Sequence, residues 1–439
     1  MPEDNPQNQT LTPAVVTKKS KRTLILLIIL VISIVVLGGI IVYVNIYNPN
    51  KNYLGTNQGR SKVATPSSTK SPTEVKTQGL SFIYFKNTSN SVEPGGGYNT
   101  IYQKEIWLYS DGKTQKLVGS GFYFDEELSK DGKKLYYISG EVVPNKGSTG
   151  TTIKQLNIET NETKTLASGV TINQEAPWQT SYSDISLSPD QNTLAFIQDG
   201  VWLLNLTTFK AEKFLNSTYY SEETMVNGHG YQEINWSPSG EYLRAEWGGY
   251  EDLGYEVIKI SDKSITPLYD GHPAAFDLVT MRDDNKLIFS DTDGDILEKE
   301  RTNLDSGQKI FTANIVANYG VGNTQQHTYK NFAVYSAKLN TLFFGRDSLT
   351  GYNDKNPIWK TDVAAYDYAT KQVKSLTEKL NINDYSMFED LQISKNSDYL
   401  VFSTDEESKS QKSDIWIIDI KNGTINFVLD DSSKPETGY

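Results

Sequence analysis

The chain contains no cysteine among its 439 residues. This absence excludes disulfide bonds, zinc sites with thiolate ligands and cysteine nucleophiles. Histidine is also scarce, with three residues, and the sequence has no G-x-S-x-G nucleophile motif, phosphate-binding loop or dinucleotide-binding motif. The familiar sequence signatures of hydrolases and nucleotide-dependent enzymes are therefore missing.

Positive charge is in deficit as well. The chain has 54 acidic and 42 basic residues, which gives a formal net charge of -12. An acidic chain repels phosphate backbones, and no basic stripe occurs beyond the N-terminal region. We therefore expect no nucleic-acid partner.

One long apolar run is present near the N-terminus. Residues Leu24 to Val44 carry no charge and are nearly all Leu, Ile or Val; as a helix they would span roughly 31 Å, enough to cross a bilayer. Four basic residues precede the run, namely Lys18, Lys19, Lys21 and Arg22. The positive-inside rule then predicts a cytoplasmic tail (1–22) and a single-pass signal-anchor helix (23–47) in the cell membrane.

A cleaved signal peptide is the competing interpretation of this run. Its apolar region would be about 7–15 residues long and would end at small residues. The run here is longer, and Val42 to Tyr47 offers no such site. Residues 48–78, rich in Ser, Thr and Pro, are expected to form a flexible linker that holds an extracytoplasmic domain away from the membrane.

The rest of the chain repeats a β-rich pattern. Segments such as Ile106 to Gly112, Val201 to Leu206 and Ile415 to Ile420 read as a hydrophobic strand followed by a polar turn. Their starts recur at intervals of roughly 40 to 60 residues, as a four-stranded propeller blade requires. The seven markers are Ile106, Ile153, Val201, Tyr255, Ile296, Ile358 and Ile415.

A second pattern is offset from the first. The segments Leu187 to Phe196 and Trp236 to Leu243 each contain a Ser-Pro turn between two strands, with looser copies at Leu128 to Leu135 and Ile393 to Leu400. Proline presets φ, and Gly or Asn accepts positive φ, so the chain can reverse there. Together the two patterns resemble the TolB-like (WD40-like, PD40) propeller repeats over about residues 79–430.

This resemblance implies an all-β fold. We expect a seven-bladed β-propeller of four-stranded antiparallel blades over residues 79–439, preceded by the transmembrane helix and the linker. No small α/β domain precedes the propeller, unlike TolB itself. The first blade begins at Leu80 and lacks its innermost strand, so either the end of the linker or the C-terminal tail is expected to close the ring.

Acidic residues occupy one equivalent position in five repeats. Because the first strand of a propeller blade is innermost, these side chains are expected to ring the mouth of the channel. They would either bind a cation or basic ligand, or cap the preceding loops by accepting backbone N–H bonds. The residues are Asp125, Asp184, Glu233, Asp277 and Asp390.

The three histidines each precede the first strand of a repeat. His229, His272 and His327 are candidate ligands of a divalent metal, although they lack the short spacing of common metal motifs. Exposed histidines without a role are the alternative. No other cofactor is indicated.

Several aromatic residues stand in expected loops. Trp178, Trp247 and Tyr250 are candidate contacts for a peptide or sugar, or else they pack between blades.

These features favour a membrane-anchored extracytoplasmic propeller that binds a protein, peptide or glycan, or acts as a scaffold, over an enzyme. The alternative is a metal-dependent polysaccharide lyase or hydrolase with its site at the channel mouth, because some propeller lyases are similar in building a metal site from loop histidines.

Overall fold

The computed structural model describes the repeat region only. It covers the following residues: 80–93, 101–143, 145, 147–168, 182–217, 230–248, 253–271, 276–291, 295–312, 315–316, 324–325, 327–353, 356–377, 386–394, 396–406 and 413–429. The predicted tail, signal-anchor helix and linker lie outside them. Among the described residues, no helix has the length and apolar character needed to cross a membrane.

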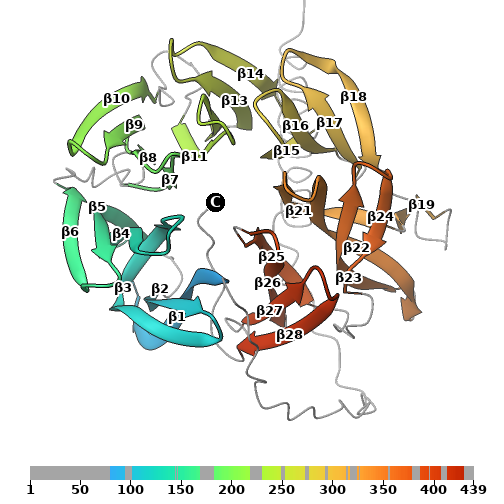
Figure 1. Ribbon diagram of the computed structural model, residues 1–439, viewed down its shortest axis with the longest axis horizontal. Helices are drawn as coiled ribbons and strands as arrows, with labels where there is room; N and C mark the ends of the chain where they lie inside the picture. Colours follow the sequence, from blue (N-terminus) through green and yellow to red (C-terminus); the bar gives the residue numbers. More distant parts are fainter. Residues whose placement is uncertain are drawn as a thin grey trace, which may run out of the picture. The chain divides into compact units, whose positions relative to one another are not determined.

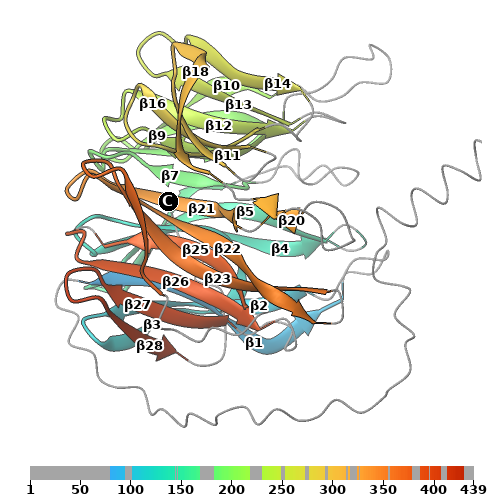
Figure 2. The same cartoon turned by 90° about the vertical axis from the view of Figure 1, so that its right-hand side faces the viewer.

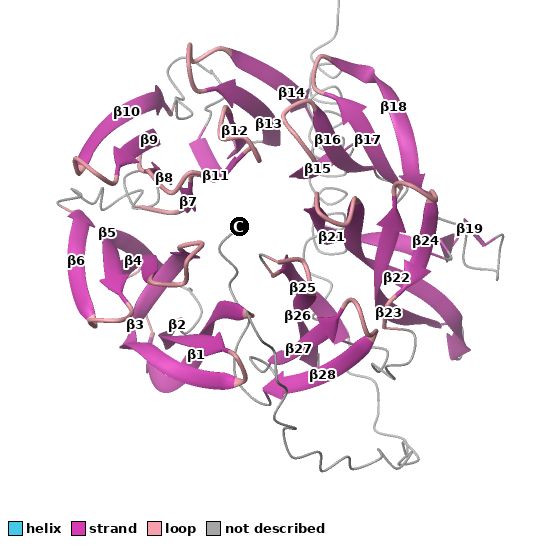
Figure 3. Ribbon diagram, in the orientation of Figure 1, coloured by secondary structure: helices cyan, strands magenta, loops and turns pink. Residues whose placement is uncertain are grey.

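The described residues form antiparallel β-sheets and no helix (Figure 3). The first sheet has six strands, which are β1 (Ser81–Val92), β2 (Ile101–Ser110), β3 (Lys113–Leu128), β4 (Lys134–Val143), β5 (Gly147–Asn157) and β6 (Glu162–Ala167). The second has four strands, which are β7 (Ile185–Leu187), β8 (Thr193–Ile197), β9 (Gly200–Asn205) and β10 (Lys210–Asn216).

Four further four-stranded sheets follow in chain order. The third contains β11 (Gly230–Trp236), β12 (Tyr242–Gly248), β13 (Leu253–Lys259) and β14 (Ile265–Gly271). The fourth contains β15 (Phe276–Met281), β16 (Lys286–Asp291), β17 (Ile296–Glu300) and β18 (Asn303–Phe311). The fifth contains β21 (His327–Ser336), β22 (Thr341–Asn353), β23 (Asn356–Asp367) and β24 (Gln372–Ser375). The sixth contains β25 (Ser386–Ile393), β26 (Tyr399–Glu406), β27 (Ser413–Asp419) and β28 (Thr424–Leu429).

A small hairpin stands apart from these sheets. Among the described strands, β19 (Ile315–Val316) and β20 (Thr324–Gln325) pair with each other alone, between β18 and β21 in the chain.

The sheets are arranged radially around a central axis, so the fold is a β-propeller (Figure 1). Strands β7, β11, β15, β21 and β25 lie nearest the centre, and β10, β14, β18, β24 and β28 lie on the outside. In the side view, strand β4 and the long hairpin β22–β23 extend toward the same side of the ring (Figure 2).

The expectation of seven four-stranded blades is wrong: the structure has six blades. The difference arises at β3, which pairs with β2 through Lys104↔Gly121 and with β4 from Phe122↔Gly140 onward. One continuous 16-residue strand therefore joins what the sequence presented as two repeats into a single six-stranded sheet.

Seven hydrophobic clusters hold the ring together. Six lie between neighbouring sheets, and one lies between the β1–β2 and β4–β5 parts of the six-stranded sheet. The cluster of Phe82, Tyr84 and Tyr109 with Ile415 and Ile417 joins the first sheet to the last and closes the ring. All contributing strands present side chains alternately to the two neighbouring sheets, which explains their nearly continuous apolar runs.

The Ser-Pro motif forms the turn between an inner strand and the next one. Ser188 Oγ donates to Asp190 Oδ1 at 2.6 Å and accepts the N–H of Thr193 at 2.9 Å, and Asp190 Oδ1 accepts the N–H of Asn192 at 3.1 Å. The same pattern recurs from Ser129 and from Ser394. The predicted turn chemistry is confirmed, and its serine and acidic or amide side chains satisfy backbone groups that would otherwise lack partners.

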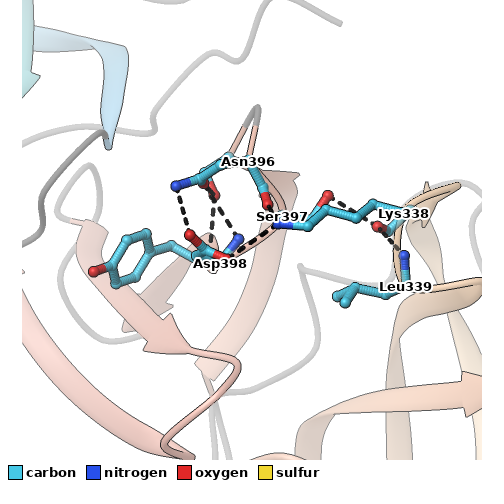
Figure 4. A network of polar contacts seen from close by, with 8 residues as sticks. Lys338, Leu339, Asn396, Ser397 and Asp398 are labelled. Atoms are coloured by element: carbon cyan, nitrogen blue, oxygen red, sulfur yellow. Dashed lines mark hydrogen bonds and ion pairs between the residues drawn. The ribbon is translucent and has the colours of Figure 1, made fainter.

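Neighbouring turns also contact one another around the ring. Lys338 in the β21–β22 turn donates to the carbonyl of Asn396 and lies 3.4 Å from Asp398 in the β25–β26 turn (Figure 4). The hydroxyls of Ser336 and Ser397 are 2.9 Å apart. Polar contacts between the β21–β22 and β25–β26 turns therefore supplement the hydrophobic clusters.

Candidate functional site

The aligned acids lie where the inner strands bulge. Asp125 falls within the irregular step between Tyr123 and Glu126 in β3, and Asp390 falls within the corresponding step in β25. Glu233 and Asp277 lie beside similar steps in β11 and β15, and Asp184 directly precedes β7. A bulge redirects the local side chains. Asp125 and Asp390 share the unpaired position of the bulge, whereas Glu233 and Asp277 are paired with the next strand and Asp184 lies just outside β7.

Two of these carboxyl groups bind the backbone of the next sheet. Asp125 Oδ2 accepts the N–H of Ile185 at 2.6 Å, and its Oδ1 accepts the N–H of Glu126 at 2.9 Å. Asp184 Oδ2 accepts the N–H of Ile234 at 2.7 Å. These bonds connect β3 to β7 and β7 to β11 in sequence. The carboxyl groups therefore secure three consecutive sheets, rather than only capping their own loops.

The same two carboxyl groups also interact with each other. Burial raises the pKa of Asp184 well above its usual range; the charge of Asp125 and a hydrogen bond to its side chain raise it further, while the N–H of Ile234 and the charge of Arg244 oppose the shift. Two hydrogen-bonded carboxyl groups must share a proton, because carboxylates offer only acceptors. Asp184 therefore keeps its proton to a higher pH than an exposed aspartate.

A buried acid accompanies this pair on β3. Glu127 Oε1 accepts the N–H of Leu187 at 3.3 Å, in parallel with the Asp125 bond to Ile185. Burial raises the pKa of Glu127, and the nearby charge of Asp125 adds to the rise. The adjacent Glu126 is fully buried. Glu127 and Asp184, at the inner edge between the first two sheets, therefore keep their protons to a higher pH than exposed carboxyl groups.

Glu233 is engaged within its own sheet. It forms an ion pair with Arg244, a buried residue of β12, and Glu233 Oε1 accepts a hydrogen bond from Asn235 Nδ2 at 2.8 Å. An ion pair with one nearly buried partner fixes both side chains. The negative charge of Glu233 is therefore largely balanced by Arg244.

Sequence reasoning missed a second polar pair in this sheet. The hydroxyl of Tyr231 donates to Glu256 Oε1 at 2.6 Å, and Glu256 is buried. Burial raises the pKa of Tyr231, and its hydrogen bond to Glu256 raises it further. The two residues are separated by a strand, and no motif joins them, so only the three-dimensional register brings them together.

The side chain of Trp247 is buried in the protein and is not available to contact a ligand. Its side chain is 5% exposed in β12, and Gly254 on β13 lies so close that a Cβ there would collide with the indole ring. Glycine at 254 is therefore required for the indole to pack flat against the neighbouring strand.

The remaining predicted residues are placed only in part. His327 begins β21, with its backbone opposite Ser348, and Asp277 lies opposite Ser290. Asp277, His327 and Asp390 are described by their backbones alone. His229, His272, Trp178 and Tyr250 lie outside the described residues.

No metal centre can be assigned within the described part of the chain. Those residues contain no group of three or more His, Asp or Glu side chains arranged to hold an ion. The carboxyl groups that the structure does place hold backbone N–H groups, an arginine or a tyrosine, which is the chemistry of a rigid frame.

The comparisons with known proteins identify the fold. No family model matches this sequence, and no curated protein matches it. An oligogalacturonate lyase in complex with manganese has a TM-score of 0.51 at 12% identity, over 80% of this chain and 86% of the lyase. A prolyl endopeptidase gives 0.52 at 12% identity over 80% of this chain, which spans 50% of the endopeptidase.

TolB from Acinetobacter baumannii is also similar, with a TM-score of 0.40 at 13% identity over 81% of this chain and 82% of TolB. The arrangement of the sheets and the two neighbours with TM-scores above 0.5 show that the protein is a β-propeller, the fold that the resemblance to TolB-like repeats implied. Identities this low leave its activity undetermined.

Proposed function

We propose that this chain is a membrane-anchored extracytoplasmic propeller that binds a protein, peptide or glycan, or holds a complex together. The observation that carries the proposal is the use of the inner carboxyl groups. Asp125 and Asp184 each bind the backbone of the next sheet, and Glu233 is paired with Arg244. These carboxyl groups hold the inner strands in fixed positions. Loops that connect strands of a rigid fold are well suited to carry binding residues.

The membrane part of the proposal rests on the apolar run Leu24 to Val44 and the four basic residues before it. We expect the full chain to remain with the membrane fraction at high pH and high salt. Protease added to closed cells should degrade the propeller and spare the tail of residues 1–22. A double substitution, Ile34→Arg with Val35→Arg, should release the chain, because each charge at the centre of a span costs about 2.5–3.5 kcal/mol.

The opposite topology, or a wild-type chain in the soluble fraction, would contradict the anchor. Substitution of the linker residue Lys62→Arg serves as the control and should leave the distribution between fractions unchanged.

Binding can be tested with immobilised glycan and peptide arrays and the full chain in detergent. Trp178→Ala and Tyr250→Ala should lower capture about tenfold or more, as for aromatic residues central to an interface. Trp247→Phe should leave capture unchanged, because that ring is buried. No capture by either array, or equal capture by all variants, would count against a ligand at these aromatics.

A lyase or hydrolase that uses a divalent metal is the second candidate. It is favoured by one observation: an oligogalacturonate lyase in complex with manganese shares the fold. His229, His272 and His327 would be its metal ligands. Elemental analysis of the purified chain, with melting curves after addition of Mn²⁺, tests this candidate; a metal-free protein whose Tm does not rise would exclude it.

A further inference from the structure

The first sheet differs in charge from the rest of the propeller. Residues 79–168 contain as many basic as acidic residues, whereas the chain after residue 168 has a large excess of acid. Two acids of the first sheet, Glu126 and Glu127, are buried near the end of β3, so they do not balance lysines at the surface. The first sheet is therefore the part of the repeat region where an anionic ligand meets the least repulsion.

Two strands of this sheet are longer than their counterparts in the second sheet. β1 has 12 residues and β2 has 10, whereas β8 has 5 and β9 has 6. The additional length of β2 precedes the repeat marker Ile106, because β2 begins at Ile101 whereas β9 begins directly before the marker Val201. The end of β1 pairs with these additional residues of β2. The first sheet thus has a surface that the second sheet does not have.

A row of polar side chains lies on one face of this additional surface. Side chains two positions apart share a face of a strand, so Glu105 and Gln103 follow one another along β2. Lys86 on β1 lies opposite Glu105. The hydroxyl of Ser120 on β3 donates to Gln103 Oε1 at 2.7 Å, and its oxygen lies 3.4 Å from Thr88 Oγ1 on β1. The row therefore joins side chains from three strands.

Trp107 holds two lysines at one end of this row. The ammonium groups of Lys86 and Lys116 lie 5.5 Å and 5.9 Å from the centre of its ring, where the π-system attracts a cation. Glu105 accepts the indole N–H at 3.0 Å and lies 3.2 Å from the Lys116 ammonium. Two lysines therefore share one carboxylate. We call the following residues the polar stripe: Lys86, Thr88, Gln103, Glu105, Lys116 and Ser120.

The polar stripe can be reached from solvent. Lys116 and Ser120 are exposed, and the other four members are half-buried. The hydrogen bonds and ring contacts within the stripe already restrict its side chains, so a ligand would have to order few of them. The stripe is thus a partly preorganised surface with an excess of positive charge.

The chemistry of the polar stripe matches a carbohydrate that carries carboxylates. Amide and hydroxyl side chains both donate and accept hydrogen bonds, as sugar hydroxyls do, and ammonium groups bind carboxylates through charge-assisted hydrogen bonds. A nucleic acid matches less well, because the stripe has no arginine and the acidic chain repels a phosphate backbone. A protein interface usually has an apolar centre, whereas all members of the stripe are polar.

We propose that the polar stripe binds an acidic polysaccharide. Its two lysines pair with carboxylates of the sugar chain, and its amide and hydroxyl side chains bond to sugar hydroxyl groups. The inference rests on the binding role proposed above and narrows the ligand to one class. It does not use Trp178 or Tyr250, so the two candidate surfaces are tested by different variants.

The test uses the full chain in detergent and three soluble polymers as probes. Alginate carries carboxylates and sugar hydroxyls, dextran carries sugar hydroxyls without carboxylates, and poly-L-glutamate carries carboxylates without sugar hydroxyls. The wild type should bind alginate about tenfold or more tightly than either other polymer. Lys86→Gln with Gln103→Ala should weaken alginate binding about tenfold, because it removes a charge pair and a hydrogen-bonding group. Lys86→Gln alone should reduce the dependence of binding on salt between about 50 and 500 mM NaCl.

Lys164→Gln with Gln115→Ala is the matched control. Lys164 lies over the ring of Phe209 in the second sheet, and Gln115 precedes Lys116 in β3 and so lies on the opposite face. This variant should bind alginate as the wild type does, and the Tm of both double variants should stay within about 2 °C of the wild type.

Three results would overturn the proposal. They are no binding of alginate by the wild type, equal affinities of the two double variants for alginate, and binding of dextran or poly-L-glutamate as tight as that of alginate. If the arrays still capture the wild type through Trp178 and Tyr250 in such a case, the general binding role stands and the polar stripe alone is refuted. A lower Tm of the first double variant leaves the decision to the salt dependence of Lys86→Gln, which must then differ from that of Lys164→Gln.

Discussion

The Asp125–Asp184 pair shows how a single polar residue can act between sheets. Each carboxyl group accepts a backbone N–H of the next inner strand. A hydrogen bond to the Asp125 side chain is also one of the causes that raise the pKa of Asp184. One proton in this pair therefore affects the contact between three sheets.

Asp184→Asn tests this coupling through its pH dependence. Because the pKa of Asp184 is raised in the folded state, the folded protein binds the proton more tightly than the unfolded chain. The stabilisation from this group is present at low pH and is lost as pH rises through the folded pKa. The free energy of unfolding of the wild type should therefore fall relative to the variant as the pH rises above the ordinary range of an aspartate, as measured by urea titration.

Asp190→Asn is the control with the opposite sign. Hydrogen bonds from Ser188 and from the N–H of Asn192 lower the pKa of Asp190, so its stabilisation is present above the ordinary Asp range and is lost as pH falls. A constant difference between wild type and Asp184→Asn across the pH range would refute the shared proton.

The sequence aligned these acids but could not predict their partners. Aligned turns suffice to place Asp125 and Asp184 at the same point of two repeats. The N–H groups they hold belong to residues 60 and 50 positions away, and sequence spacing carries no information on such contacts. Trp247 illustrates the same limit, because its burial depends on a glycine in the next strand.

At the scale of elements, the turn after each inner strand is the most regular unit. Ser188 is buried and connects the two strands that flank it through its hydroxyl. The serine of each such turn, and the acidic or amide residue two positions later, can be recognised in the sequence. The turn could therefore be predicted in full from local hydrogen-bonding chemistry.

Ser188→Ala should lower the free energy of unfolding by about 1–2 kcal/mol, because it leaves the N–H of Thr193 without its side-chain acceptor and removes one of the donors to Asp190. Chemical denaturation measures the effect. Ser183→Ala, at an exposed position just before β7, should change the stability by less than about 0.5 kcal/mol. Equal losses in the two variants would mean that the turn hydroxyl contributes nothing specific.

The number of blades could not be read from the repeat, and the reason lies in β3. Its sequence contains Gly119, Ser120 and Gly121, a composition that normally indicates a turn. In the structure these residues continue the strand, and Gly121 pairs with Lys104. Glycine permits a turn but does not require one, so a strand that passes from one neighbour to another looks like two strands.

At the scale of the whole molecule, the propeller depends on contact between the two ends of the repeat region. Phe82 and Tyr109 stack at 4.9 Å beside Val401, Ile415 and Ile417. In a closed ring every sheet has two neighbours, so a defect at one contact is transmitted to the next. The stability of the last sheet should therefore depend on the first.

Phe82→Ala should lower the free energy of unfolding by about 3–5 kcal/mol, as expected for the loss of a large buried side chain. Hydrogen exchange should show faster exchange in β26 and β27 as well as in β1 and β2, although these pairs of strands lie at opposite ends of the repeat region in the chain. Phe209→Ala, where the ring is 42% exposed, provides the comparison. Faster exchange confined to β1 and β2 would show that the sheets unfold independently.

The contact that closes the ring also imposes an order on biosynthesis. Phe82, Tyr84 and Tyr109 are made early, whereas Val401, Ile415 and Ile417, which cover them, are made near the end of the chain. Contacts of such large sequence separation form slowly, and uncovered apolar surface favours association with other chains. Until the last sheet emerges, this apolar surface of the first sheet lacks the side chains that cover it in the folded protein, and we expect aggregation to be favoured most during that interval.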